Sequence, residues 1–174
     1  MDANALRDEA TRLYKAGQLD ESVAAFEQVR AGYAAEGKEA LAASVANDLG
    51  VVYFLNGKPE QARGALSEAL AAFEKLGDVT GQAKAIGNLA QLMSRSGDKE
   101  GAVKNYTRAA ELFHQVGEAG MEHDTFRALS QMQLQRGRVL EALAAYDQAL
   151  AAKGGSRFLR AFLQIPLKLV GLRK

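Results

Sequence analysis

Apolar residues recur along this chain at the spacing of amphipathic helices, and glycines interrupt them at regular intervals. In residues 3–16, for example, apolar side chains fall three or four positions apart, so they line one face of a helix. No stretch alternates apolar and polar residues with the β-branched enrichment that is typical of strands. The pattern therefore predicts an all-α protein of about eight helices, followed by a C-terminal segment of different character.

Four glycines stand forty residues apart, each at a turn between two expected helices: Gly17, Gly57, Gly97 and Gly137. Glycine ends a helix readily because it adopts the left-handed conformation at little cost. Small residues recur seven positions before these glycines and five and twelve after them, where two helices must approach closely. Large residues recur nine positions after, to fill the space between units: Phe26, Leu66, Tyr106 and Tyr146.

One helix pair cannot bury its apolar faces alone, so neighbouring pairs must stack. The period predicts an array over residues 1–153, with units at about 3–37, 38–77, 78–117 and 118–153, and a separate segment at 154–174. In the fourth unit we expect a buried apolar set of Phe126, Leu129, Leu134, Leu143, Tyr146 and Leu150. We also expect Asp78 to cap the helix that follows it.

The second unit carries the pattern in its clearest form, at Leu49-Gly50, Tyr53, Gly57, Ala62, Ala69 and Leu70. This pattern resembles the tetratricopeptide repeat, and the resemblance covers about residues 3–152, more weakly in the first unit. The usual unit has 34 residues and ends in proline, whereas these units have forty and lack that proline. We expect the additional residues to lengthen the second helix of each pair and the linker. The resemblance implies a right-handed α-solenoid similar to adaptor and scaffold proteins with extended repeats.

The resemblance also implies a concave groove lined by the first helix of each pair. A peptide or helical segment of another protein would bind there, with amides meeting its backbone and arginines meeting its acids. The expected groove residues are Arg7, Thr11, Tyr14, Asn47, Val51, Phe54, Lys84, Gln91, Arg95, Arg127 and Gln131, with Asn4, Ser44, Ser94, Asp124 and Leu134 beside them. For any single one of these residues, simple solvation on a helix surface is the competing interpretation.

Some relatives clamp a terminal carboxylate with lysine and asparagine at set positions. Arg7 and Asn47 fall at one such place, but Thr11 and Val51 stand where asparagine is required. We therefore do not predict that clamp.

The charges are distributed unevenly. Sixteen basic and all 21 acidic residues lie at or before Asp147, so this part carries a net charge of −5, whereas the six charged residues after it are all basic. An acidic body argues against a general nucleic-acid binder, which would present a basic face.

The basic segment has a polar stripe and an otherwise apolar surface. Pro166 prevents one continuous helix, so we expect a helix only over about Ser156–Ile165. Three roles remain open: capping the last hairpin, binding a membrane surface, or docking into a partner or a second copy, which would make a homodimer. The residues expected to make these contacts are Arg157, Phe158, Arg160, Phe162 and Lys168.

No motif for catalysis, a cofactor or a metal emerges. The chain has no cysteine, and its two histidines, His114 and His123, are nine residues apart, which is not a helical ligand spacing. The N-terminus does not resemble a secretory signal, and no apolar run approaches the ~20 residues of a membrane span. The sequence predicts a non-enzymatic, cytoplasmic adaptor without cofactors, whose groove binds a protein partner. The alternative is a peripheral membrane protein tethered by the C-terminal segment.

Overall fold

The computed structural model describes residues 3–155, so the predictions made for Ser156–Ile165 and for the contacts of the basic segment lie outside the described residues. Within residues 3–155 the chain forms eight α-helices and no strand. The helices are α1 (Ala3–Lys15), α2 (Leu19–Ala35), α3 (Glu39–Leu55), α4 (Pro59–Leu76), α5 (Val79–Ser96), α6 (Lys99–Gln115), α7 (Ala119–Gln135) and α8 (Val139–Ala152).

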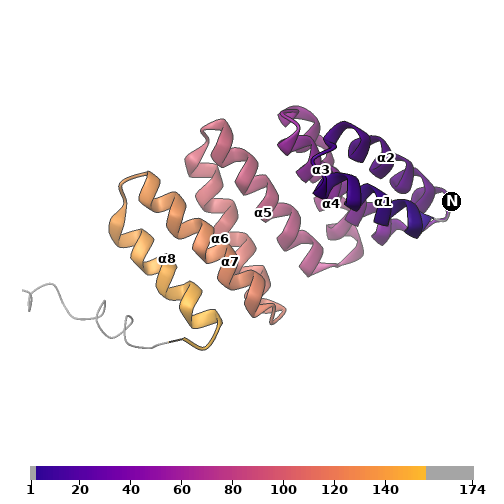
Figure 1. Cartoon of the computed structure of the whole chain (residues 1–174). Coiled ribbons are helices and arrows are strands. Elements are labelled where there is room, and N and C mark those ends of the chain that lie inside the picture. The colour runs from indigo at the N-terminus through magenta and orange to yellow at the C-terminus, as the bar shows by residue number, and fades with distance from the viewer. Residues whose placement is uncertain (1–2, 156–174) are drawn as a thin grey trace, which may run out of the picture.

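These helices form four antiparallel hairpins, which stack side by side in one row from α1 and α2 at one end to α7 and α8 at the other (Figure 1). Each hairpin packs mainly on the next one in sequence, as in a solenoid. The right-handed all-α solenoid of four repeats is thereby confirmed. We call α1, α3, α5 and α7 the inner helices.

The turns are built on glycines with a positive φ, which recur every twenty residues from Gly17 to Gly137. At Gly77, where φ is 68°, the chain reverses between α4 and α5. The next amide, that of Asp78, then donates to the carbonyl of Phe73 at 2.9 Å. This pairing satisfies a carbonyl that the helix end would otherwise leave free. Asp78 also caps α5 as predicted, because its side chain accepts a hydrogen bond from the amide of Gly81 at 2.8 Å.

Within each hairpin the small residues allow the two helices to approach closely. The four positions seven residues before the turn glycines are all buried: Ala10, Gly50, Ala90 and Ser130. In the first and last hairpins a serine hydroxyl forms a hydrogen bond from one helix to the backbone of the other. Ser22 Oγ donates to the carbonyl of Ala10 at 2.9 Å, and Ser130 Oγ donates to that of Ala142 at 2.8 Å.

Large side chains of the outer helices fill the space between hairpins. Tyr33, Phe73 and Phe113 stand forty residues apart, and each is at most 5% exposed. Phe73 shares a core cluster with Ala85 of the next inner helix. Leu66 shares another with Leu89 and Leu92. The hydrophobic core is therefore a series of layers between hairpins, one per repeat.

The structure corrects the expected location of the extra residues in each repeat. The helices α3 and α4 have 17 and 18 residues, and α5 and α6 have 18 and 17. The linker between the second and third hairpins has only residues 77 and 78. The forty-residue period is thus divided evenly between the two helices, and the linkers remain short.

The predicted core of the fourth unit is wrong at three positions. Leu134, Leu143 and Tyr146 are 55%, 39% and 44% exposed. Leu134 lies one residue before the end of α7. The other two lie on α8, against which no helix of residues 3–155 packs beyond α7. Position in the repeat predicts burial only where a following hairpin supplies the cover.

Candidate functional site

Three hollows open along the inner helices. One, of about 290 Å³, lies between α1 and α3 and is lined by Thr11, Tyr14, Asp48 and Val51, among others. The other two, of about 460 and 440 Å³, lie between α5 and α7. We call this shared side of the inner helices the groove.

A ladder of contacts crosses the groove from each inner helix to the next. Arg7 of α1 donates to Asp48 of α3 at 3.0 Å and to the hydroxyl of Ser44, also at 3.0 Å. Asn88 of α5 donates to Asn47 of α3 at 2.9 Å. Both Arg7–Asp48 and Asn47–Asn88 join residues 41 positions apart, so they are the same rung in successive repeats. Arg7, which we expected to meet acids of a partner, is instead paired within the chain.

A second type of rung has the same spacing. The guanidinium of Arg95 on α5 lies over the ring of Phe54 on α3, 5.8 Å from its centroid. Such cation–π contacts stabilise by roughly 0.5–1 kcal/mol at exposed sites. This contact orders Arg95 and holds its charge at the groove.

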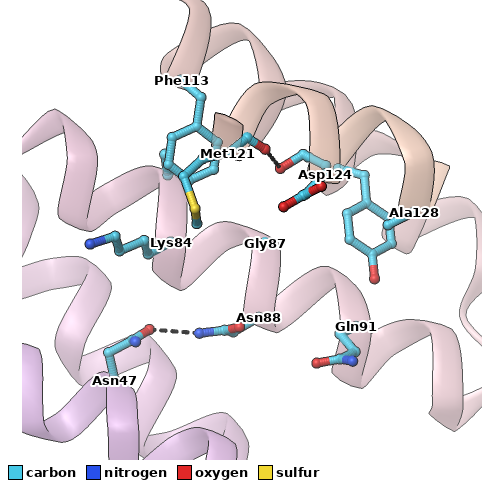
Figure 2. A pocket seen from close by; sticks show the side chains of 12 residues that line it. Asn47, Lys84, Gly87, Asn88, Gln91, Phe113, Met121, Asp124 and Ala128 are labelled. Carbon is cyan, nitrogen blue, oxygen red and sulfur yellow. Dashed lines mark hydrogen bonds between the residues drawn. The ribbon is translucent and has the colours of Figure 1, made fainter. Parts of the chain in front are cut away.

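One repeat further along the chain, the positions equivalent to Asn47 and Asn88 carry no polar side chains, so no rung of the first type can form there. The residues at these positions are Gly87 on α5 and Ala128 on α7. The hollow of about 460 Å³ opens here, and both residues line it together with Asn47 and Asn88 of the preceding rung. Figure 2 shows the Asn47–Asn88 hydrogen bond at one side of this open space. We call this hollow the rung gap.

The rung gap combines an apolar wall with polar groups. Met121, which is 39% exposed, contributes the apolar surface together with the half-buried Gly87 and Ala128. Gln91 and Lys84 extend from α5, whereas Asp124 faces them from α7 (Figure 2). The hollow can therefore hold a large apolar group, and Gln91, Lys84 and Asp124 are placed to contact polar groups beside that apolar group.

The 440 Å³ hollow continues the rung gap along α5 and α7, since Gln91, Tyr106 and Ala128 line both. Tyr106 comes from the outer helix α6, and burial raises the pKa of its phenol. The hydroxyl is therefore protonated at neutral pH and able to donate a hydrogen bond. Together the two hollows form a trough that extends to Gln131 and Gln135 near the end of α7.

Positive charge gathers along this trough. Lys84 and Arg95 form no ion pair within residues 3–155, and Arg127 lies 3.9 Å from Asp124. Asp124 is the acid among them. Its pKa is lowered, chiefly by a hydrogen bond from His123 and further by the charges of Lys153, His123 and Arg127. The lining of the trough thus has two cations, Lys84 and Arg95, and one acid, Asp124, in a chain whose residues up to Asp147 carry a net negative charge.

The predicted groove residues all lie on the inner helices. Thr11, Tyr14 and Val51 line the first hollow, whereas Asn47, Lys84, Gln91, Arg95 and Gln131 line the trough. Sequence reasoning missed Asp48, Asn88 and Tyr106. The sequence contains a signal for the first two: Asp48 directly follows the predicted groove residue Asn47, and Asn88 stands forty residues further on, at the same register.

In the part of the chain that the structure describes, no cluster of three or more histidine, cysteine or acidic side chains could hold a metal ion. His114 lies 3.2 Å from Glu122, and His123 lies 3.0 Å from Asp124, so each histidine faces a single acid. Among the same residues, none of the helices has the length and hydrophobicity to span a membrane.

Comparison with known proteins identifies the repeat. Two family models described as tetratricopeptide repeat match residues 41–115 and 88–157. No curated protein matches the sequence.

Solved structures with the same fold include BtubC (BKLC) from P. vanneervenii, with 22% identity and a TM-score of 0.75 over 99% of this chain. The match covers 66% of the BtubC chain, so the present chain spans slightly less than two thirds of it. A kinesin light chain protein with TPR-like repeats from Podosopora anserina is 20% identical, with a TM-score of 0.72 over 87% of this chain and 74% of its own. At these identities the likeness concerns the fold.

Proposed function

The chain belongs to the tetratricopeptide-repeat family, and from this premise we propose that it is a non-enzymatic adaptor that binds a segment of another protein in its groove. Repeats of this family generally serve as protein–protein interaction scaffolds. The observation that carries the proposal is the rung gap, where Gly87 and Ala128 replace the polar pair of the preceding repeats. The partner is an acidic segment that inserts one large apolar side chain into this gap.

The anchor follows from the shape and lining of the rung gap. Its volume of about 460 Å³ exceeds that of any single side chain, so it also has room for part of a partner's backbone. Met121, which is 39% exposed, offers apolar contact, and Gln91 offers amide groups to a backbone. Interfaces obtain most of their binding energy from a few anchors of this kind.

The acidic character follows from the charges around the trough. Lys84 and Arg95 line it, and only Asp124 among its lining residues is acidic. A partner that carries carboxylates would gain complementary contacts there and would be steered toward the groove on its approach. A basic partner would meet repulsion at the trough.

The test begins with peptides selected against the full chain from a randomised library. We expect the selected peptides to be enriched in Asp and Glu around one aromatic or large aliphatic residue. Lys84→Glu and Arg95→Glu should each weaken their binding at least tenfold, measured by fluorescence anisotropy, which corresponds to about 1.4 kcal/mol. Lys104→Glu is the matched control, because Lys104 is an exposed lysine on the outer helix α6; it should leave affinity within about twofold.

The anchor is tested separately by filling the rung gap. Ala128→Leu adds three carbons at its edge and should weaken binding of the same peptides at least tenfold, whereas the melting temperature should stay within about two degrees. Selected peptides without acidic enrichment, or equal affinity for the charge-reversed variants, would contradict the acidic partner. Unchanged affinity for Ala128→Leu would contradict the anchor.

A further inference from the structure

The hollow between α1 and α3, which we call the first hollow, has a counterpart further along the groove. The residues that line the first hollow are Thr11, Tyr14, Phe26, Asp48, Val51 and Val52. Eighty residues after each of these stand residues that all line the 440 Å³ hollow between α5 and α7: Gln91, Ser94, Tyr106, Ala128, Gln131 and Met132. The same hollow therefore occurs twice in the groove, two repeats apart. We call the counterpart the second hollow.

A side chain of the protein itself occupies the equivalent place between these two hollows. Phe54 on α3 packs against the buried cluster that contains Leu66, which stands forty residues after Phe26. Arg95 lies over the ring of Phe54, 5.8 Å from its centroid. A segment that crosses the groove from α1 to α7 thus meets an open hollow, then a filled place with a cation on it, and then the second hollow.

The first hollow is apolar. Phe26, which comes from the outer helix α2 and is 4% exposed, lies at its base, and the half-buried Tyr14 and Val51 form its accessible walls. Among the described residues that line it, only Asp48 is charged, and Asp48 pairs with Arg7 at 3.0 Å. An uncharged apolar side chain therefore fits the first hollow best.

The second hollow has polar walls at the same places. Gln91 stands where the first hollow has Thr11, and Gln131 stands where it has Val51. Arg95 also lines the second hollow and brings a positive charge to it. The two ends of the groove therefore differ in what they bind: an uncharged apolar side chain at α1 and α3, and acidic groups beside the rung gap at α5 and α7.

We propose that the first hollow is a second anchor site for the partner segment, and that it holds an uncharged aliphatic or aromatic side chain. This inference rests on the proposed function, because the other anchor of the segment lies in the rung gap. The segment crosses the inner helices as an extended chain. The exposed Gln91 and Gln131 stand one repeat apart on its path, and their amides can bond to backbone groups that a helical segment would pair internally.

The repeat also predicts the spacing of the two anchors. Packed helices lie about 8–10 Å apart, so two sites two repeats apart are separated by roughly 20 Å. An extended chain advances about 3.3 Å per residue, which places the two large apolar residues of the partner about six positions apart. The residues between them cross Phe54 and Arg95. We expect small or acidic side chains there, because the ring already fills that place and the guanidinium attracts carboxylates.

The test uses the peptides selected against the full chain. They should carry a second large apolar residue about six positions from the first, with no preference for a large residue midway. Val51→Asn removes apolar surface from the first hollow and should weaken binding of these peptides at least about fivefold, measured by fluorescence anisotropy. The matched control is Val116→Asn, because Val116 is 38% exposed at the end of α6 and lines none of the three hollows. It should leave affinity within about twofold.

Alanine substitutions in the peptide assign each apolar residue to its site. When one of the two apolar residues is changed to alanine, the loss caused by Val51→Asn should fall below about twofold, whereas the loss caused by Ala128→Leu should remain. When the other apolar residue is changed, the reverse should hold. Such matching is the coupling expected of groups in direct contact. A loss that Val51→Asn causes equally with every peptide overturns the second anchor.

A second variant keeps the test decisive if Val51→Asn lowers the melting temperature. Val51→Thr retains the shape of the side chain and places a hydroxyl in the apolar wall, so it should weaken the two-anchor peptides at least about threefold. Unchanged affinity for both variants overturns the second anchor. An optimal spacing of about 13 residues, the separation expected along a helix, overturns the extended path.

The second anchor and the proposed function fail in different ways. Acidic peptides with one apolar residue, weakened by Ala128→Leu and not by Val51→Asn, support the proposed function and overturn the second anchor. Peptides weakened by Val51→Asn and not by Ala128→Leu overturn the anchor in the rung gap and support the first hollow as an apolar binding site.

Discussion

Gly50 of α3 and Leu66 of α4 lie so close together that a Cβ atom built on the glycine would stand 2.5 Å from the Cγ of the leucine. Gly50 and Leu66 are both buried, and Leu66 also packs against the next hairpin through Leu89. The leucine cannot retreat without disturbing that second interface. The closeness of the two helices in this hairpin therefore depends on the absence of a side chain at residue 50.

Gly50→Ala should accordingly destabilise the protein by about 1–3 kcal/mol, the usual cost of overpacking a core. Urea unfolding followed by circular dichroism measures this change. The matched control is Gly64→Ala in α4, where no atom lies within 4 Å of the added Cβ. This second change should raise stability by up to about 1 kcal/mol, because alanine favours a helix over glycine. Equal effects of the two changes would contradict the steric explanation.

Much of this fold follows from the sequence because its requirements are local and repeated. Gly57, between two helical patterns, predicts a turn. Gly50, within a helical pattern that is followed by a second helix, predicts that the two helices approach each other closely. The forty-residue spacing then predicts that neighbouring hairpins pack alike. Tyr146 shows the limit of such reasoning: it has the register of Phe26 and Leu66, but burial depends on what lies against it.

The site was less predictable, since it depends on pairs of side chains from different repeats. Arg7 was expected to face a partner, but Asp48 neutralises it from the next inner helix. The rung gap was not foreseen, because it arises where two small residues, Gly87 and Ala128, meet across the groove. No single repeat contains that information.

The Arg7–Asp48 pair leads to a prediction about affinity. Asp48→Asn removes the charge that pairs with Arg7, so the guanidinium becomes available to carboxylates of a partner. Affinity for acidic peptides that reach the first hollow should rise by about two- to fivefold, as anisotropy titrations at low salt would show. The control is Asp8→Asn, which changes an exposed acid at the equivalent position of the first repeat. Similar gains for both variants would mean that net charge alone is responsible.

A capping interaction predicts a non-additive pair of substitutions. The carboxylate of Asp98 accepts a hydrogen bond from the amide of Gly101 at 2.8 Å, at the start of α6. A Cβ at Gly101 would stand 2.3 Å from the other carboxylate oxygen. The cap therefore requires glycine three residues later.

Asp98→Ala should cost about 1 kcal/mol, as the loss of an N-cap usually does. Gly101→Ala should destabilise the natural chain, because the added carbon displaces the cap. In the Asp98→Ala background the same change should instead be neutral or stabilising, since alanine favours the helix. Thermal or urea unfolding of the four proteins gives the coupling, and strictly additive effects would show that the cap and the glycine are independent.

Tyr53 provides a prediction about pH. It lies on α3, and its hydroxyl donates a hydrogen bond to the carboxylate of Glu27 on α2, which connects the first two hairpins. Burial, followed by the contact with Glu27, raises the pKa of Tyr53 to about 12 from a value near 10. The folded chain therefore holds the phenol proton more tightly than the unfolded chain does.

Because the folded pKa is the higher one, the stabilisation is fully present below pH 10 and is lost as the pH rises toward 12. Tyr53→Phe removes this dependence. The difference in free energy of unfolding between the natural chain and Tyr53→Phe should be constant from pH 7 to 9 and should shrink above pH 10. Since solvent screens the partly exposed pair, the change should be no more than about 1 kcal/mol. Urea unfolding of both proteins at matched pH cancels the titration of lysines and other tyrosines, and a difference that stays constant up to pH 11.5 would contradict the link to Glu27.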